Sequence, residues 1–237
     1  MTSFVLKIIA LVTMFCDHFG YALVGHSSFW NYIGRIAFPI FAFQISEGYT
    51  HTKNLKKYFI RLFVFALISQ IPFHLFLQKF IPNSVGSLNI FFTLILGLLC
   101  MKIYDYFSNV EDNILGYKIF GIKIGQIIGI LFTLLIAYVG ELLKVDYGAW
   151  GVIVIFAFYL FKNNKLATII SYISLVVIRY GYRIICYGVY MQYIYLAIAT
   201  ILPIVFISLY KGKQGRKIKY FLYLFYPVHL FALYFLG

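Results

Sequence analysis

The sequence has little charge, few acidic residues and no cysteine framework. Only 11% of its 237 residues are charged, and seven of these are acidic, whereas a soluble globular domain is about 25% charged. Such scattered carboxylates exclude a di-metal carboxylate site. The three cysteines, Cys16, Cys100 and Cys186, fall within apolar runs, and their odd number and spacing fit neither a zinc site nor a disulfide framework. We therefore expect no bound metal and interpret the cysteines as small core residues.

Signature motifs of several enzyme classes are also missing. The chain has no HExxH zinc-protease motif, no GxSxG nucleophile elbow, no Walker loop and no CxxCH haem attachment site. No internal repeat is visible, which weakens the case for a transporter built from two related halves. These absences leave the apolar runs and their few polar interruptions as the informative features.

Apolar stretches of membrane-spanning length recur from end to end of a chain that is 63% hydrophobic. We therefore predict an all-α polytopic protein of the cytoplasmic (inner) membrane, forming a single domain over residues 1–237. The sequence predicts nine spans, at residues 4–25, 30–49, 58–77, 88–105, 122–141, 146–161, 166–180, 187–210 and 219–237. The sixth and seventh are shorter than the roughly 20 residues that a full crossing needs.

The net charge of +13 is carried mainly by short connections between these spans. Four alternate connections hold fourteen of the twenty Lys and Arg residues, whereas the opposite connections hold Lys79, Lys144, Arg179 and Arg183. Because a cytoplasmic excess of Lys and Arg orients membrane spans, we predict a cytoplasmic amino terminus and an external carboxyl terminus. The positive charge is thereby explained by the orientation of the spans in the lipid bilayer, and we expect no nucleic acid as a partner.

Five ionisable side chains interrupt the predicted spans: Asp17, His18, Arg35, Glu47 and His229. A charged group at the bilayer centre costs about 3 kcal/mol on insertion scales, so such residues usually face a partner or a water-filled cavity. Structural explanations exist for each. Asp17 and Arg35 can form an ion pair between spans, and His18 can be a hydrogen-bonded core histidine. Glu47 can reach the cytoplasmic interface, and His229 can cap backbone groups freed by the preceding proline.

Convergence favours a function for three of these side chains. Asp17, His18 and Arg35 occur within 19 residues across one helical hairpin. Neighbouring helical residues point about 100° apart, so if His18 faces a cavity, Asp17 faces Arg35. A histidine in a cavity can act as a general base near neutral pH. The sequence therefore suggests a proton-transferring group buried between helices.

Several stretches together resemble the TraX family, named for the conjugation-associated protein that acetylates the amino terminus of F-type pilin. They are KIIALVTMFCDHFGYAL, IGRIAFPIFAFQISEGYTHTKNLKKYFIRLFVFALISQIPF, LNIFFTLILGL and, near the end, YPVHL. The match is close over the first 100 residues and continues as a hydrophobic pattern. The resemblance implies an integral-membrane acyltransferase, in which cytoplasmic acyl-CoA delivers its acyl group to a buried histidine.

The resemblance also implies roles for individual residues. His18 would remove a proton from an amine or hydroxyl as that group attacks the thioester carbonyl, while Asp17 holds Arg35 or tunes His18. Arg35 or Asn89 would stabilise the developing oxyanion. His229 and Glu47 occupy further polar positions of the family and are expected near the substrate. A route through an acyl-histidine intermediate is the alternative mechanism.

The phosphates of acetyl-CoA, the expected co-substrate, would meet the cytoplasmic ends of the second and third spans. The candidate residues there are Arg61, His51, Asn54 and Lys57. Positive-inside topology alone also explains the lysines, whereas Arg61 has the better claim because guanidinium pairs phosphate bidentately. The acceptor would be a membrane or cell-envelope molecule, such as a pilin-like amino terminus or a glycan.

Two interpretations from other classes compete with acyl transfer. A proton-coupled transporter or flippase would use Asp17, His18 and Glu47 as a proton relay. A non-catalytic scaffold of a secretion or pilus apparatus would tolerate replacement of His18.

Overall fold

The computed structural model describes residues 1–25, 28–110, 117–119, 121–216 and 218–237, which are folded mainly as helices. The helices are α1 (Ser3–Phe19), α2 (Phe29–Gly34), α3 (Ala37–His51), α4 (Leu55–Phe80), α5 (Ile90–Ser108), α6 (Ile124–Leu142), α7 (Gly148–Leu160), α8 (Lys165–Tyr187), α9 (Met191–Ile201), α10 (Pro203–Ser208) and α11 (Lys219–Leu236). A π-helical turn, η1 (Gly20–Val24), continues α1, and a 3-10 turn, η2 (Pro82–Ser84), follows α4. Two short strands, β1 (Lys118–Ile119) and β2 (Ile122–Lys123), form an antiparallel hairpin before α6.

Several long helices begin at a polar side chain that caps the first turn. The side chains of Thr2, Asn54, Asn89 and Asn164 each accept a hydrogen bond from a backbone N–H of the helix that follows. Such caps satisfy amide groups that have no partner within the helix. These capping residues fix the first residue of each helix, even where hydrophobicity alone does not show where the helix begins.

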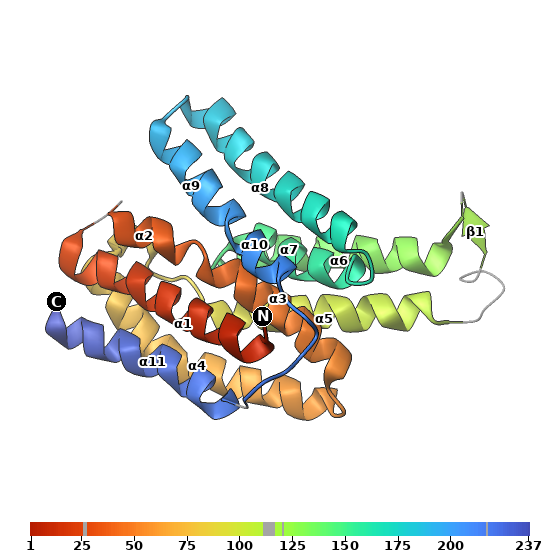
Figure 1. The fold of residues 1–237 in the computed structure, drawn as a ribbon, viewed down its shortest axis with the longest axis horizontal. Helices are drawn as coiled ribbons and strands as arrows, with labels where there is room; N and C mark the ends of the chain where they lie inside the picture. Colours follow the sequence, from red (N-terminus) through yellow and green to blue (C-terminus); the bar gives the residue numbers. More distant parts are fainter. Residues whose placement is uncertain (26–27, 111–116, 120, 217) are drawn as a thin grey trace.

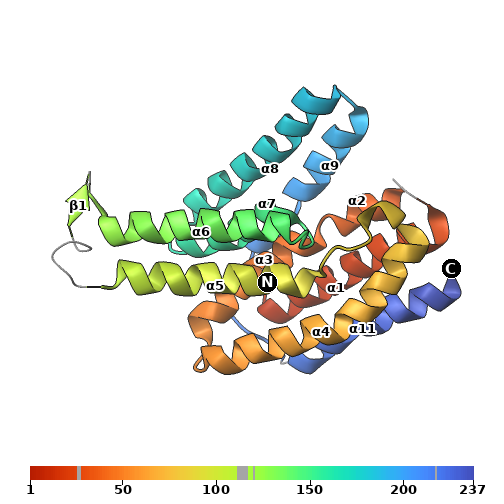
Figure 2. The same ribbon diagram turned by 180° about the vertical axis from the view of Figure 1, so that it is seen from behind.

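The bundle has a body and a projecting hairpin (Figures 1 and 2). In the body, α4 and α11 pack along each other, α1 packs on α3 and α11, and α5 packs on α6 and α7. Helices α1, α4 and α11 run in the same direction (Figure 1). This is the direction expected for them as the first, third and ninth of the predicted spans. Helices α8 and α9 form the projecting hairpin and contact the body through α2, α7 and α10. The core of the body contains Phe38, Phe76, Leu98, Ile155 and Leu230, all almost fully buried.

The prediction of an all-α polytopic membrane protein is confirmed. Within the described ranges, six helices are long and apolar enough to cross a membrane, and two shorter apolar helices lie at Gly148–Leu160 and Tyr220–Leu236. Every one of the nine predicted ranges contains a helix or a broken helix. Nine crossings and the orientation of the two termini stay predictions.

Two predicted spans are broken rather than continuous, and a third was drawn too short. The range 30–49 is divided between α2 and α3, because Pro39 has no N–H for the carbonyl of Arg35 and its ring crowds that carbonyl. The range 187–210 is likewise divided between α9 and α10, where Pro203 opens the second piece. The range 166–180 was wrong at its end, since α8 continues for 23 residues to Tyr187.

Candidate active site

The structure joins the two histidines of the first and last helices. His18 on α1 and His229 on α11 are 211 residues apart in sequence, yet Nδ1 of His18 lies 2.8 Å from Nε2 of His229. Nδ1 of His229 lies 2.7 Å from the backbone carbonyl oxygen of Phe225, one turn earlier in α11. His229 is only 5% exposed. The three groups therefore form a continuous chain of hydrogen bonds into the bundle.

This chain fixes where the protons lie when both rings are neutral. A carbonyl oxygen can only accept, so Nδ1 of His229 carries a proton and donates to Phe225, which leaves Nε2 of His229 as an acceptor. Nδ1 of His18 must then carry a proton and donate to it. The remaining nitrogen, Nε2 of His18, is unprotonated and has a free lone pair. His18 is thus held in the tautomer that a general base requires.

Aromatic rings hold the pair in place. Phe76 of α4 meets the His18 ring edge-on at a centroid distance of 5.3 Å, and Tyr226 of α11 meets it at 6.2 Å. Phe225 stacks on His229 at 4.9 Å. Such edge-to-face and stacked contacts favour one ring orientation over others. They therefore also fix the direction of the lone pair on Nε2 of His18.

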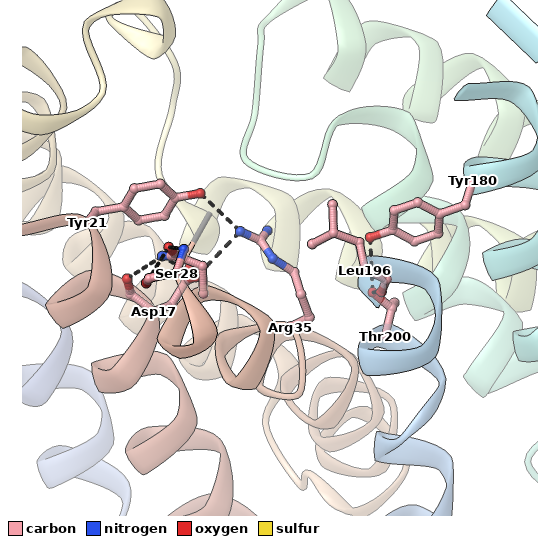
Figure 3. Close-up of polar contacts among 8 residues, drawn as sticks. Asp17, Tyr21, Ser28, Arg35, Tyr180, Leu196 and Thr200 are labelled. Atoms are coloured by element: carbon pink, nitrogen blue, oxygen red, sulfur yellow. Dashed lines mark hydrogen bonds and ion pairs between the residues drawn. The ribbon is translucent and has the colours of Figure 1, made fainter. Parts of the chain in front are cut away.

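Asp17 faces the other side of α1, as the 100° helical spacing predicts. Its Oδ1 atom lies 3.4 Å from the guanidinium of Arg35, and the side chain of Asn31 donates to its backbone carbonyl at 2.9 Å. The same guanidinium group donates to the hydroxyl of Tyr21 at 3.1 Å (Figure 3). At Gly34 a Cβ atom would come within 2.2 Å of the Asp17 side chain, so glycine permits this close approach of α2. Asp17 therefore holds Arg35 and the α2–α3 break, not the His18 ring.

A large cavity of about 810 Å³ lies at the end of the bundle where α3 ends and α4 and α11 begin. Its lining includes one acidic side chain, Glu47, and five basic ones, Lys7, His51, Lys53, Arg61 and Arg216, of which His51, Lys53 and Arg216 are exposed and mark the mouth. The buried part of the lining is mainly apolar and includes Met14, Leu62, Phe91, Leu94 and Tyr226. Met14 lies one helical turn before His18 on the same face of α1, and Tyr226 touches the His18 ring. His18 and His229 do not themselves line the large cavity, and Tyr226 connects its apolar lining to the His18 ring.

Three of the sequence-predicted residues line this large cavity: Glu47, His51 and Arg61. The Nε atom of Arg61 is buried without a hydrogen-bond partner among the described residues, so it is available to a ligand. Asn54 and Lys57 lie elsewhere. Asn54 is the cap of α4 and accepts from the backbone N–H of Lys57 at 2.8 Å, which gives it a structural role, while its phosphate contact stays a prediction.

Asn89 is not placed to donate to an oxyanion. Its side chain is fully buried at the start of α5. Both N–H bonds of its amide are engaged, one with the carbonyl of Ala66 at 2.7 Å and one with the side chain of Gln70 at 2.8 Å. Its Oδ1 atom accepts from the backbone N–H of Phe91. Asn89 thus ties α4 to α5, and oxyanion stabilisation needs another donor.

Comparison with known proteins identifies the family of the chain. The family described as TraX protein matches residues 3–237. The chain belongs to the TraX family. It is also 28% identical to the "Probable fimbrial assembly protein FimC, serogroup H1" of Dichelobacter nodosus, over 97% of this chain and 93% of that protein. No solved structure matches the chain.

In this TraX-family chain, two functional candidates were missed by the sequence analysis. The hydroxyl of Tyr226 is buried with no hydrogen-bond partner among the described residues, at the boundary between the large cavity and the histidine pair. The sequence feature that could have indicated Tyr226 is the motif YPVHL, in which the sequence analysis considered only the histidine. The second is a pair of arginines in α8, Arg179 and Arg183, whose signal was their place in an otherwise apolar helix. Within the described residues, no three His, Cys, Asp or Glu side chains gather as metal ligands.

Proposed function

We propose that the protein is a membrane-embedded acyltransferase that moves an acyl group, such as acetyl, from cytoplasmic acyl-CoA to an amine or hydroxyl of a membrane or envelope acceptor. The single observation that supports this most is the large cavity, whose basic mouth leads to an apolar lining that includes Tyr226, the residue that contacts the His18 ring. Charge at one end and a buried proton acceptor at the other match a thioester donor that carries phosphates.

The donor would lie along the length of the large cavity. The phosphates of CoA would pair with Arg61, Lys53 and Arg216 at the mouth, with Arg61 able to engage phosphate bidentately. The apolar inner part would take the thioester arm and bring its carbonyl to the Tyr226 end. A volume of about 810 Å³ is within the usual range of small-molecule and cofactor pockets.

The transfer step then uses three side chains. Nε2 of His18 takes the proton from the acceptor amine or hydroxyl as that group bonds to the thioester carbon. The hydroxyl of Tyr226 donates to the oxyanion that develops on the carbonyl oxygen. Nε2 of His229 accepts a hydrogen bond from Nδ1–H of His18 and so stabilises the imidazolium. When the C–S bond breaks, the proton passes from His18 to the departing CoA thiolate.

A pilin-related acceptor is favoured by the comparisons. The similar Dichelobacter nodosus protein is described by name as a fimbrial assembly protein, and the family name refers to a protein of pilin processing. Pilin, or a protein that assembles with it, is therefore the first acceptor to test, ahead of an envelope glycan. Mass spectrometry of pilin and envelope material from cells with and without the gene would reveal an added acyl mass. Identical masses in both would exclude these acceptors.

A transporter is supported less well by the described contacts. Asp17 bonds toward α2 and α3, His18 bonds toward α11, and Glu47 lines the large cavity. No hydrogen bond or ion pair of the described residues links these three groups into a relay. Purified protein in liposomes separates the two functions: acyl transfer predicts release of CoA from acetyl-CoA that depends on acceptor, and transport predicts proton flux without CoA release.

A further inference from the structure

A second, small cavity of about 270 Å³ lies at the opposite end of the bundle from the large cavity. It is formed where η1, α2 and α3 meet the start of α7, the end of α8 and the length of α9. Its lining includes three arginines, Arg35, Arg179 and Arg183, together with Trp150, Tyr180 and Thr200. The predicted topology puts this small cavity on the external side.

Two of the three arginines, Arg179 and Arg183, have no ion-pair partner among the described residues and are held by aromatic rings instead. The guanidinium carbon of Arg179 lies over the Trp150 ring, 4.3 Å from its centroid. Arg183 lies over Tyr180 at 5.7 Å, and Tyr180 is itself bonded to Thr200 (Figure 3). Ring contacts of this kind fix the orientation of an arginine while leaving its N–H groups free to donate.

The charge in and around the small cavity is unbalanced. Arg35 pairs with Asp17 at 3.4 Å, and this is the only ion pair among the described residues. Its Nε atom is buried and has no hydrogen-bond partner there. Asp146, in the turn before α7, and Glu141, which accepts a hydrogen bond from the backbone N–H of Ala149, are the other carboxyl groups at the start of α7, and neither lines the small cavity. The described lining therefore holds three guanidinium groups and no carboxylate, which leaves an excess positive charge there after Arg35 has paired with Asp17.

Arg179 and Arg183 also lie on the side of the membrane where the positive-inside rule predicts few basic residues. Cations are depleted from the external ends of membrane spans, and ionisable residues in apolar helices usually mark a binding or transport site. Two arginines four residues apart lie on one face of a helix. Their position in α8 therefore calls for a compensating negative group.

We infer that the small cavity is an anion site that binds a carboxylate or phosphate group of the acceptor. The assignment to the acceptor rests on the proposed acyl transfer, whereas the anion site itself does not. Guanidinium groups bind either anion through paired hydrogen bonds, and the small cavity has room for one such group but not for a polymer. His18 lies on the other side of α1, so the reacting amine or hydroxyl would stand about 10 Å from the anion, roughly one helix width.

Trp150 provides a local reporter of occupancy. The sequence has two tryptophans, so Trp30→Phe leaves Trp150 as the sole source of indole emission. Inorganic phosphate, titrated at constant ionic strength into this purified full-length variant in phosphatidylcholine nanodiscs, is expected to change the emission in a saturable way. Arg183→Gln, which leaves the Arg179–Trp150 stack intact, is expected to weaken the apparent affinity about tenfold or more.

Two matched variants control the measurement. Lys165→Gln removes one charge from the far end of the same helix, and Arg61→Ala alters the large cavity; both are expected to keep the parent response. A response of equal affinity in Arg183→Gln, or no response in the parent, would overturn the anion site.

A further experiment uses nanodiscs that contain phosphatidylglycerol, with no free phosphate added. If they alone produce the change, the occupant is a lipid headgroup and the assignment to the acceptor is overturned. Loss of acyl transfer with an intact phosphate response would instead refute only the proposed function.

Discussion

Replacing His229 tests whether it positions His18 or only fills space. His229→Ala removes the acceptor for the Nδ1 proton of His18, so His18 can adopt the other tautomer, in which Nε2 carries the proton and cannot act as a base. It also removes a hydrogen bond to the imidazolium formed during transfer. Hydrogen bonds to charged groups contribute about 1.5–3 kcal/mol. At about 1.36 kcal/mol per factor of ten, we expect kcat to fall roughly 10- to 150-fold.

The assay is steady-state CoA release from acetyl-CoA by purified protein with acceptor present. Because His229 does not line the large cavity, the KM for acetyl-CoA is expected to stay unchanged. His229→Gln keeps an acceptor of similar reach and is expected to recover part of the loss. His74→Ala, a histidine of α4 that lines neither cavity, is the control for general effects, and the thermal midpoint of each variant shows whether it is folded. A kcat in His229→Ala equal to that of the parent would refute the positioning role.

Three further predictions concern the donor, the oxyanion and the topology. Arg61→Ala is expected to raise the KM for acetyl-CoA about tenfold with little change in kcat. The exposed Lys57 is the control, and Lys57→Ala is expected to raise the KM less. Equal increases in KM for both variants would show that Arg61 does not bind the phosphates. Tyr226→Phe, which removes one hydroxyl, is expected to lower kcat about 10²-fold, and unchanged turnover would remove Tyr226 from the mechanism. A reporter fused to the carboxyl terminus is expected to be active only outside the cytoplasm, and cytoplasmic activity would show that the count of nine crossings is wrong.

Local helical geometry was enough to predict part of the site. The spacing of Asp17 and His18 by one residue required them to face different neighbours, and the structure has Asp17 against Arg35 and His18 against α11. The polytopic fold was equally accessible, because apolar runs of membrane length are a property of composition. These predictions depend on the geometry of one helix or of two adjacent ones.

Contacts between distant parts of the chain were beyond this reasoning. Nothing in the periodicity of the first and last spans specifies that His18 and His229 pair, because the pairing depends on how α1, α4 and α11 pack. The capping roles of Asn54 and Asn89 were missed for a different reason. Each directly precedes an apolar helix, a position typical of capping residues, and that local signal was outweighed by the family pattern.

The most direct measurement of the central claim is transfer of label from radioactive acetyl-CoA to pilin or envelope acceptor by purified protein carrying His18→Ala. The proposed mechanism predicts that transfer falls about 10²–10⁴-fold, while acetyl-CoA still binds in the large cavity and His74→Ala transfers label as the parent does. Label transfer by His18→Ala at the rate of the parent protein would contradict the mechanism.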